Sequence, residues 1–514
     1  MARIITRLRE WRQIEADLHR MQTAPSEIEF WRQAQQIAAL GSQVVPVIVG
    51  NLDRADARLL AAMGAVAALL DREEVVTALH QAILEPQRSD QGRMAAMSIL
   101  ERFLGQPPAD ELLASLRDPE GAALRSLEEV LDRAAGAPTL WIEYIQGLDR
   151  QEPDVVLSVV RALRQMGSER AVEPLRLIAQ DVRGEIAAAA LQALGTFRLP
   201  QAGWALQTLL PIVHPELRPT AERALRKLRF AGVAVEPLPA PDPGWRALVG
   251  PVEGSGQRSL WFLQLNRRTA QVRFLNVLLT DQAGAIEAVG QAQVPAWMLP
   301  PSRPVGSLHD LPLPDGSGAL LMAEAPFDLG RRLVVEALAY NRQTQIPVAG
   351  VLRLLSPWLW GYGGADSLPP VVLPDPGTGA EALVAVSDRL LGHPAFLTWT
   401  VRSQALFRAA EESRRYPGWD REVWARRVAG DLFSDPAVRQ VVSRRLVAMS
   451  EWLLLTGDEP MARLALATAG AIGQVAASDL PFLQALVRRD LEAVWRGIKE
   501  GTEPFFGLEI ESGV

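Results

Sequence analysis

The chain of 514 residues contains no cysteine. Disulfide bridges, thiolate metal sites and thiol catalysis are therefore excluded, and so is a small secreted fold held together by disulfides. Lysine is nearly absent as well, because Lys227 and Lys499 are the only lysines among 53 basic residues. We draw no function from this bias toward arginine.

Long hydrophobic runs are also missing. The longest apolar stretches, such as residues 59–70, are much shorter than the ~20 residues that a membrane-spanning helix needs. The first residues predict an amphipathic, charged helix and not a signal peptide. We therefore expect no membrane span and a cytoplasmic location.

A strong excess of positive charge is absent too. The 53 basic residues are outnumbered by 60 acidic ones, which gives a net charge of -7. No region carries the positive surplus that neutralising a phosphate backbone requires. We therefore expect no nucleic-acid partner.

Catalytic and metal-binding motifs are likewise missing. The 5 histidines lie far apart, with no pair at metal-ligand spacing and no HExxH motif. The glycines of Gly254-Ser255-Gly256 are followed by neither the lysine nor the helix of a phosphate loop, and no Gly-x-Ser-x-Gly elbow occurs. The sequence thus predicts no catalytic residue, no cofactor and no metal. It favours a non-enzymatic protein, while an enzyme remains the alternative.

What the first half does contain is a recurring glycine. Gly105, Gly136, Gly167 and Gly195 are separated by 31, 31 and 28 residues, and an apolar or small residue precedes each of them. Such a period in a helical sequence is typical of stacked helix pairs, that is, of a solenoid. A glycine at this position fits the end of the first helix, where a left-handed residue terminates it.

The sequence around the last of these glycines resembles HEAT repeats, in particular the short HEAT-like type found in phycobilisome lyases. The resemblance rests on Asp181-Val182-Arg183, Ile186, Ala187, Ala190-Leu191 and Leu194-Gly195, and it recurs at Leu217-Arg218, Ala221 and Ala224-Leu225. It covers roughly residues 27–230 and implies an α-solenoid. The steps from Gly41 to Gly64 and from Gly64 to Gly105 depart from the period, and 119–150 match loosely. HEAT-like arrays serve many roles, so the resemblance implies an architecture and no activity.

The predicted fold class is mainly α, with a small β-rich middle module. Short strands are expected at 245–249, 259–265, 271–279 and 285–289, followed by irregular chain over 295–318 and a helix over 329–341. Residues 438–455 and 461–472 predict a helical hairpin. The predicted domains are an α-solenoid (1–230), a proline-rich linker (231–244), the β-rich module (245–365), a Pro/Gly linker (366–379), a C-terminal helical domain (380–500) and an acidic tail (501–514).

Two clusters are candidate partner-binding sites. Trp358, Trp360 and Tyr362 lie beside flexible glycines and would form a hot spot if they were exposed. The alternative is that these rings pack where the β-rich module joins the C-terminal domain. The second cluster comprises Arg414, Arg415 and Trp419, whose arginines would suit an acidic peptide or a phosphate.

For this second cluster the alternative is a solvated outer face on which neighbouring acids pair with the arginines.

The leading functional hypothesis is a non-enzymatic scaffold for protein–protein interaction. A second is a binder of a chromophore-like small molecule, or a lyase-type enzyme, with its pocket where the β-rich module meets the helical domains. A third, a HEAT-like DNA-repair protein, is disfavoured by the charge. The sequence leaves the oligomeric state open.

Overall fold

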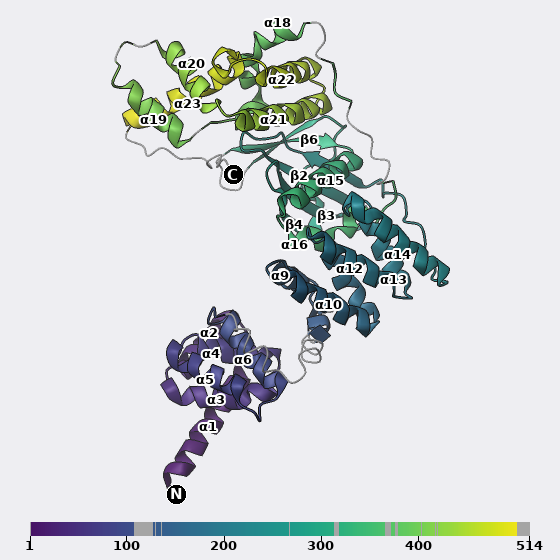
Figure 1. Ribbon diagram of the computed structural model, residues 1–514, viewed down its shortest axis with the longest axis vertical. Helices are drawn as coiled ribbons and strands as arrows, with labels where there is room; N and C mark the ends of the chain where they lie inside the picture. The colour runs from purple at the N-terminus through teal and green to yellow at the C-terminus, as the bar shows by residue number, and fades with distance from the viewer. Residues whose placement is uncertain are drawn as a thin grey trace. The chain divides into compact units, whose positions relative to one another are not determined.

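The computed structural model describes residues 2–500, except 107–126, 129, 135, 267, 313–317, 365–371, 376–378, 402, 417 and 419; of residues 2–10, 27 and 57 it describes only the backbone. The described chain is mainly helical and has one six-stranded antiparallel sheet (Figure 1), which confirms the predicted class at this level. It forms two compact units, Met1–Leu140 and Trp141–Val514. This division falls inside the predicted solenoid, and the solenoid and the domain boundaries stay predictions.

The first unit is built from amphipathic helices around one apolar core. Several of these helices begin at a side-chain cap, as where Asp56 accepts from the backbone N–H groups of Arg58 and Leu59 at 3.0 and 2.8 Å. Leu18, Ile48 and Leu79 lie in the core. The described helices are α1 (Ala2–Met21), α2 (Glu27–Ala38), α3 (Val44–Asn51), α4 (Ala57–Ala67), α5 (Arg72–Leu84) and α6 (Asp90–Arg102).

The second unit begins with further helices in pairs. They are α9 (Leu140–Asp149), α10 (Pro153–Met166), α11 (Val172–Ile178), α12 (Gly184–Leu194), α13 (Pro200–Leu209) and α14 (Arg218–Phe230). Gly167 ends α10 in the left-handed region at φ +60°, as predicted. For Gly195 the predicted reason is wrong, because its φ is -67°. A Cβ there would lie 2.7 Å from Cβ of Ala224, so close packing of α12 on α14 requires this glycine.

The sheet has the strand order β4-β3-β2-β1-β6-β5. The strands are β1 (Trp245–Val249), β2 (Gln257–Asn266), β3 (Gln271–Thr280), β4 (Gly284–Pro295), β5 (Leu308–Pro312) and β6 (Ala319–Ala325). The first four confirm the predicted strands. The prediction of irregular chain over 295–318 is wrong for β5, which is an edge strand, where proline is tolerated; its register pairs His309 with Met322.

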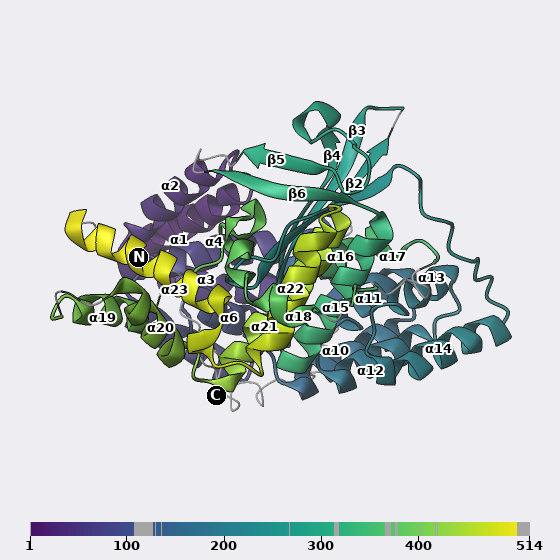
Figure 2. The same cartoon turned by 90° about the horizontal axis from the view of Figure 1, so that it is seen from above.

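One face of the sheet carries α15 (Phe327–Thr344), and α16 (Gly350–Leu355) packs beside it against β4, as Figures 1 and 2 show. Trp245 of β1 stacks on Phe327 with 5.0 Å between ring centroids. A Cβ on Gly330 would lie 2.6 Å from the ring of Phe262, so this glycine lets α15 approach the sheet. On the opposite face, Leu248 and Met322 belong to a second apolar cluster.

The C-terminal helices contact the same sheet through α21. They are α18 (Ala380–Val384), α19 (Gln404–Ser413), α20 (Arg421–Leu432), α21 (Pro436–Leu455), α22 (Glu459–Ile472) and α23 (Pro481–Glu500), preceded by α17 (Pro357–Trp360). The predicted hairpin is present as α21 and α22. Trp452 of α21 donates from Nε1 to the carbonyl of Val249 at 2.8 Å, and Arg445 pairs with Asp281 at 2.7 Å. Among the described helices, none has both the length and the apolar character that crossing a bilayer requires.

Glu253, in the loop between β1 and β2, gives a first prediction. Burial raises the pKa of its carboxyl, partly offset by a hydrogen bond from Ser255. A raised pKa means that the folded state binds the proton more tightly than the unfolded chain, so this residue destabilises the fold as pH rises through that pKa. We expect Glu253→Gln to be more stable than the wild type at pH 7, and the difference to shrink as pH falls toward 4. Urea unfolding of both proteins across this range measures it, and a difference that is independent of pH would contradict the assignment.

Candidate functional site

The tryptophan cluster proves to be largely interior. Trp360 is 1% exposed and lies under the guanidinium of Arg331, 5.1 Å from the ring centroid. Tyr362 is half-buried and meets Trp245 and Phe327 edge-on, at 6.4 and 6.3 Å. These contacts agree with the packing alternative, but they run to β1 and α15 and not to the C-terminal helices. A partner cannot reach the Trp360 ring in this arrangement.

Trp358 belongs to a different environment. Its ring is half-buried and lies 5.9 Å from the guanidinium carbon of Arg273 on β3. The structure thus brings Trp360 and Tyr362 together around α15 and places Trp358 against the sheet. The three aromatic residues do not form one exposed surface.

The arginine cluster lies at the end of α19. Arg414 and Arg415 are exposed there, whereas Trp419 lies outside the described residues. The acids around them pair locally, because Arg427 is 3.9 Å from Glu412 and Arg488 is 3.4 Å from Glu422. These ion pairs are made by Arg427 and Arg488, so the solvated-face alternative for Arg414 and Arg415 stays a prediction.

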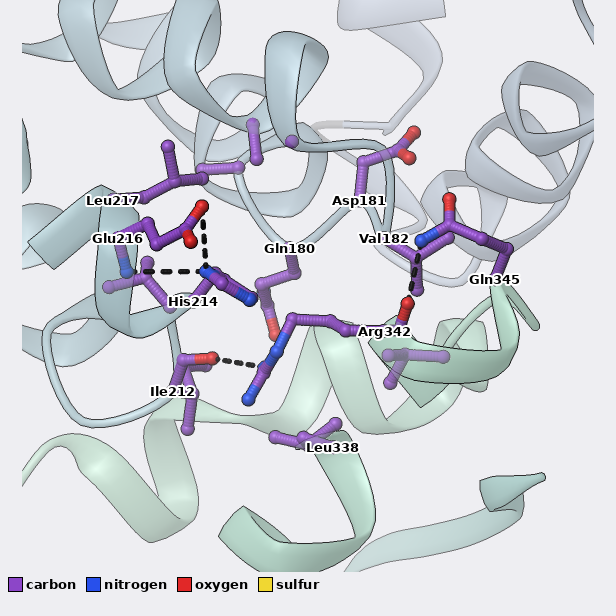
Figure 3. A pocket seen from close by; sticks show the side chains of 15 residues that line it. Gln180, Asp181, Val182, Ile212, His214, Glu216, Leu217, Leu338, Arg342 and Gln345 are labelled. Atoms are coloured by element: carbon purple, nitrogen blue, oxygen red, sulfur yellow. Dashed lines mark hydrogen bonds and ion pairs between the residues drawn. The ribbon is translucent and has the colours of Figure 1, made fainter. Parts of the chain in front are cut away.

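A cavity of about 220 Å³ lies elsewhere, where two turns between helices meet the C-terminal end of α15 (Figure 3). The turn between α11 and α12 contributes Gln180, Asp181 and Val182, and the turn between α13 and α14 contributes Ile212, His214 and Glu216. From α15 and the residues after it come Leu338, Arg342, Gln345 and Val348. The cavity therefore lies between the helix pairs and the part of the chain that carries the sheet. This is the junction at which the ligand-binding hypothesis places a pocket.

Arg342 is the central charge of this cavity. Its half-buried side chain crosses the space toward the α13–α14 turn, where Nη1 donates to the carbonyl of Ile212 at 2.9 Å (Figure 3). Burial lowers the pKa of the guanidinium. Among the described residues, no carboxylate forms an ion pair with it. Arg342 is thus a partly desolvated cation with a single carbonyl partner.

The acids near the cavity do not compensate this charge. Asp181 is held by Arg183, which donates to it from the backbone N–H at 2.8 Å, from Nε at 3.0 Å and from Nη2 at 2.7 Å. The side chain of Glu216 is 87% exposed and lies 3.9 Å from His214. Nδ1 of His214 accepts from the backbone N–H of Glu216 at 3.2 Å. The histidine therefore caps the start of the next helix.

The described lining of the cavity offers few reactive groups. It contains no serine, threonine, lysine or tyrosine that would serve as a nucleophile. His214 is committed to the backbone and Asp181 to Arg183, so no nucleophile and base face each other. In the described part of the chain, no three histidine or acidic side chains gather as they would around a metal ion.

A second polar cluster lies on the opposite face of the sheet from α15. Nε2 of His309 is 2.8 Å from Oε2 of Glu324, which also accepts from Nη1 of Arg246 at 2.8 Å. These residues come from β5, β6 and β1, and both His309 and Glu324 are buried. Within the described chain no hydroxyl bonds to His309, so this histidine is a satisfied core residue.

Sequence reasoning assigned His214 to a turn, as found, but it did not single out Arg342. Nothing around Arg342 in the sequence distinguishes it from other arginines. Its importance arises from the carbonyl of Ile212, which is 130 positions away. A scan against protein-family models finds no match to this chain, and searches among curated proteins and among solved structures likewise find no similar protein.

Proposed function

We propose that this protein is a non-enzymatic interaction scaffold, and that it anchors an acidic side chain of a protein partner at Arg342. The observation that carries the proposal is the state of Arg342, a half-buried cation with one carbonyl partner and no carboxylate among the described residues. A carboxylate that enters the cavity would form charge-assisted hydrogen bonds with it. Such bonds are strong because water is partly excluded.

The size of the cavity favours a side chain over a cofactor. Pockets for drug-sized molecules usually measure about 300–1,000 Å³, whereas this one measures about 220 Å³. One aspartate or glutamate side chain would fill much of it. Leu338, Val348 and Ile212 would contact the methylene groups of that side chain.

The position of the cavity supports a macromolecular partner. It is formed at the turns of successive helix pairs, and arrays of helix pairs bind macromolecules along extended surfaces. If the HEAT-like array predicted from the sequence is correct, this cavity is one point on such a surface. The rest of the partner would then lie along neighbouring turns.

The test compares Arg342→Met with Arg226→Met, an exposed arginine of α14 in the same stack. Each tagged full-length variant is purified from the native cells and co-eluting proteins are quantified by mass spectrometry. A partner anchored by a buried charge pair should bind Arg342→Met at least tenfold more weakly, since losing one member of such a pair costs about 2–5 kcal/mol. Arg226→Met should recover it as the wild type does.

A second step distinguishes a direct contact from a general loss of structure. With the partner purified, each acidic residue in its binding region is changed to the amide. One such change should weaken binding about as much as Arg342→Met, and combining the two should cause little further loss. Equal recovery by wild type and Arg342→Met, or purely additive losses for every acid, would overturn the proposal.

A further inference from the structure

A second cavity, of about 320 Å³, lies between the sheet and α21. Its walls are mostly apolar and include Leu329 and Leu333 of α15 with Trp452 and Leu455 of α21. Arg258 of β2 and Glu451 of α21 are its polar groups. It is separate from the cavity at Arg342 and independent of the function proposed there.

Arg258 differs from the other buried arginines that the structure describes. Six of these have a carboxylate at 3.5 Å or less, namely Arg88, Arg93, Arg176, Arg331, Arg353 and Arg445. Arg258 is only 7% exposed, yet no carboxylate of the described chain pairs with it. Its Nη2 donates to the carbonyl of Ala448 at 2.9 Å. Burial lowers the pKa of this guanidinium to about 10.

The nearby acids are bound to another arginine. Arg332 donates from Nη2 to Glu451 at 3.0 Å and from Nη1 to Glu336 at 2.6 Å. Both carboxylates therefore act on Arg258 from a distance and leave its guanidinium without a direct anionic partner. Burial also raises the pKa of Glu336, so this carboxyl can take up a proton when another anion binds nearby.

We propose that this cavity binds an apolar molecule ending in a carboxylate, with the carboxylate on Arg258 and the chain along Leu329, Leu333 and Trp452. A buried guanidinium without a carboxylate partner among the described residues is the group that best matches a carboxylate. The volume sets the length of the chain. At about 30 Å³ for each water-sized group, the cavity holds about ten non-hydrogen atoms, which corresponds to a medium-chain fatty acid such as octanoate.

The experiment is isothermal titration of the full-length protein with octanoate, and with acetate and 1-octanol as partial ligands. We expect octanoate to bind with one site and a Kd on the order of 0.1 mM, by the usual efficiency of small ligands. Acetate lacks the chain and 1-octanol lacks the charge, so both should bind at least tenfold more weakly. If 1-octanol binds as tightly as octanoate, or if octanoate does not bind at millimolar concentration, the assignment is wrong.

Two variants locate the binding. Arg258→Met should weaken octanoate binding at least tenfold. Arg444→Met, which changes an exposed arginine of the helix α21 that forms one wall of the cavity, should leave octanoate binding unchanged. Because Arg258 also bonds to Ala448, a misfolded Arg258→Met protein would not report on binding, so Leu455→Trp is the second test. That change fills the cavity and keeps the charge, and it should abolish octanoate binding. Unchanged octanoate binding in Leu455→Trp would overturn the proposal.

Discussion

Replacing Arg176 with methionine should lower the free energy of unfolding by about 3–5 kcal/mol, the usual cost of removing one partner from a buried polar network. Arg176 lies on α11 and is 0% exposed. Its Nη1 donates to the carbonyl of Arg353 at 3.1 Å and to Oγ of Ser356 at 2.7 Å, and Nη2 donates to the carbonyl of Leu354 at 3.0 Å. Methionine fills similar space but makes none of these bonds.

The loss is large because of where the acceptors lie. Arg353 and Leu354 belong to the last turn of α16, where carbonyls have no partner within the helix. Arg176 provides that partner from a helix 177 positions earlier in the chain. Without the guanidinium, the carbonyl of Arg353 keeps its bonds from Gln180 and Ser356, at 3.1 and 2.9 Å. The carbonyl of Leu354 and Oγ of Ser356 each lose a buried donor, which costs about 1–3 kcal/mol for each group.

Urea unfolding followed by tryptophan fluorescence measures the effect. Arg161→Met on the exposed face of α10 is the matched control, and we expect it to stay within about 0.5 kcal/mol of the wild type. Glu173→Gln removes the charge that pairs with Arg176 but keeps an oxygen acceptor, and since the Glu173 side chain is 40% exposed it should cost much less. An Arg176→Met protein within about 1 kcal/mol of the wild type would show that the network contributes little.

Contacts between residues far apart in the chain, such as those of Arg176, decide which parts of the fold could be predicted from the sequence. The first four strands could be predicted because their apolar residues lie between clear turn signals, such as Gly254-Ser255-Gly256. Gly167 could be predicted because a left-handed residue is a local requirement. Gly195 could not be explained in advance, because what requires it is the backbone of α14 beside it. Strand β5 was missed because it exists through its pairing with β6.

The same distinction applies to the candidate sites. Composition correctly marks Trp360 as a residue of large contact area, but it does not tell whether that area faces solvent or Arg331. A functional arginine is harder still to recognise from the sequence, because nearly all of the 53 basic residues are arginines. What distinguishes Arg258 and Arg342 is that they are buried or half-buried without forming an ion pair to a carboxylate of the described chain, which is a property of tertiary packing.

Replacing Gly284 with alanine should lower the free energy of unfolding by about 2–5 kcal/mol. Gly284 begins β4 with φ +77°, and an added Cβ would lie 2.3 Å from the carbonyl oxygen of Ala337 and from Oδ1 of Asn341. The left-handed conformation costs an alanine about 1–2 kcal/mol, and forcing a methyl group into packed structure costs about 1–3 kcal/mol more.

Neither of the two oxygen atoms that the added Cβ would meet can move easily. Ala337 contributes helix backbone, and Asn341 is fixed because it accepts from the N–H of Ala285 and donates to the carbonyl of Ala283, both at 2.8 Å. The β3–β4 turn is therefore locked onto α15 next to Arg342. Displacing this contact should shift the end of α15 that forms one wall of the cavity.

Gly232→Ala is the control that separates strain from collision, since Gly232 has φ +81° and a Cβ there would meet nothing within 4 Å. This variant should show only the cost of placing an alanine in the left-handed conformation. Its unfolding midpoint in urea should therefore lie between those of the wild type and Gly284→Ala. If the partner proposed above binds at Arg342, Gly284→Ala should also weaken its recovery while Gly232→Ala does not. Equal midpoints for the two variants would mean that this turn does not hold α15, and that the position of Arg342 depends instead on its own bond to Ile212.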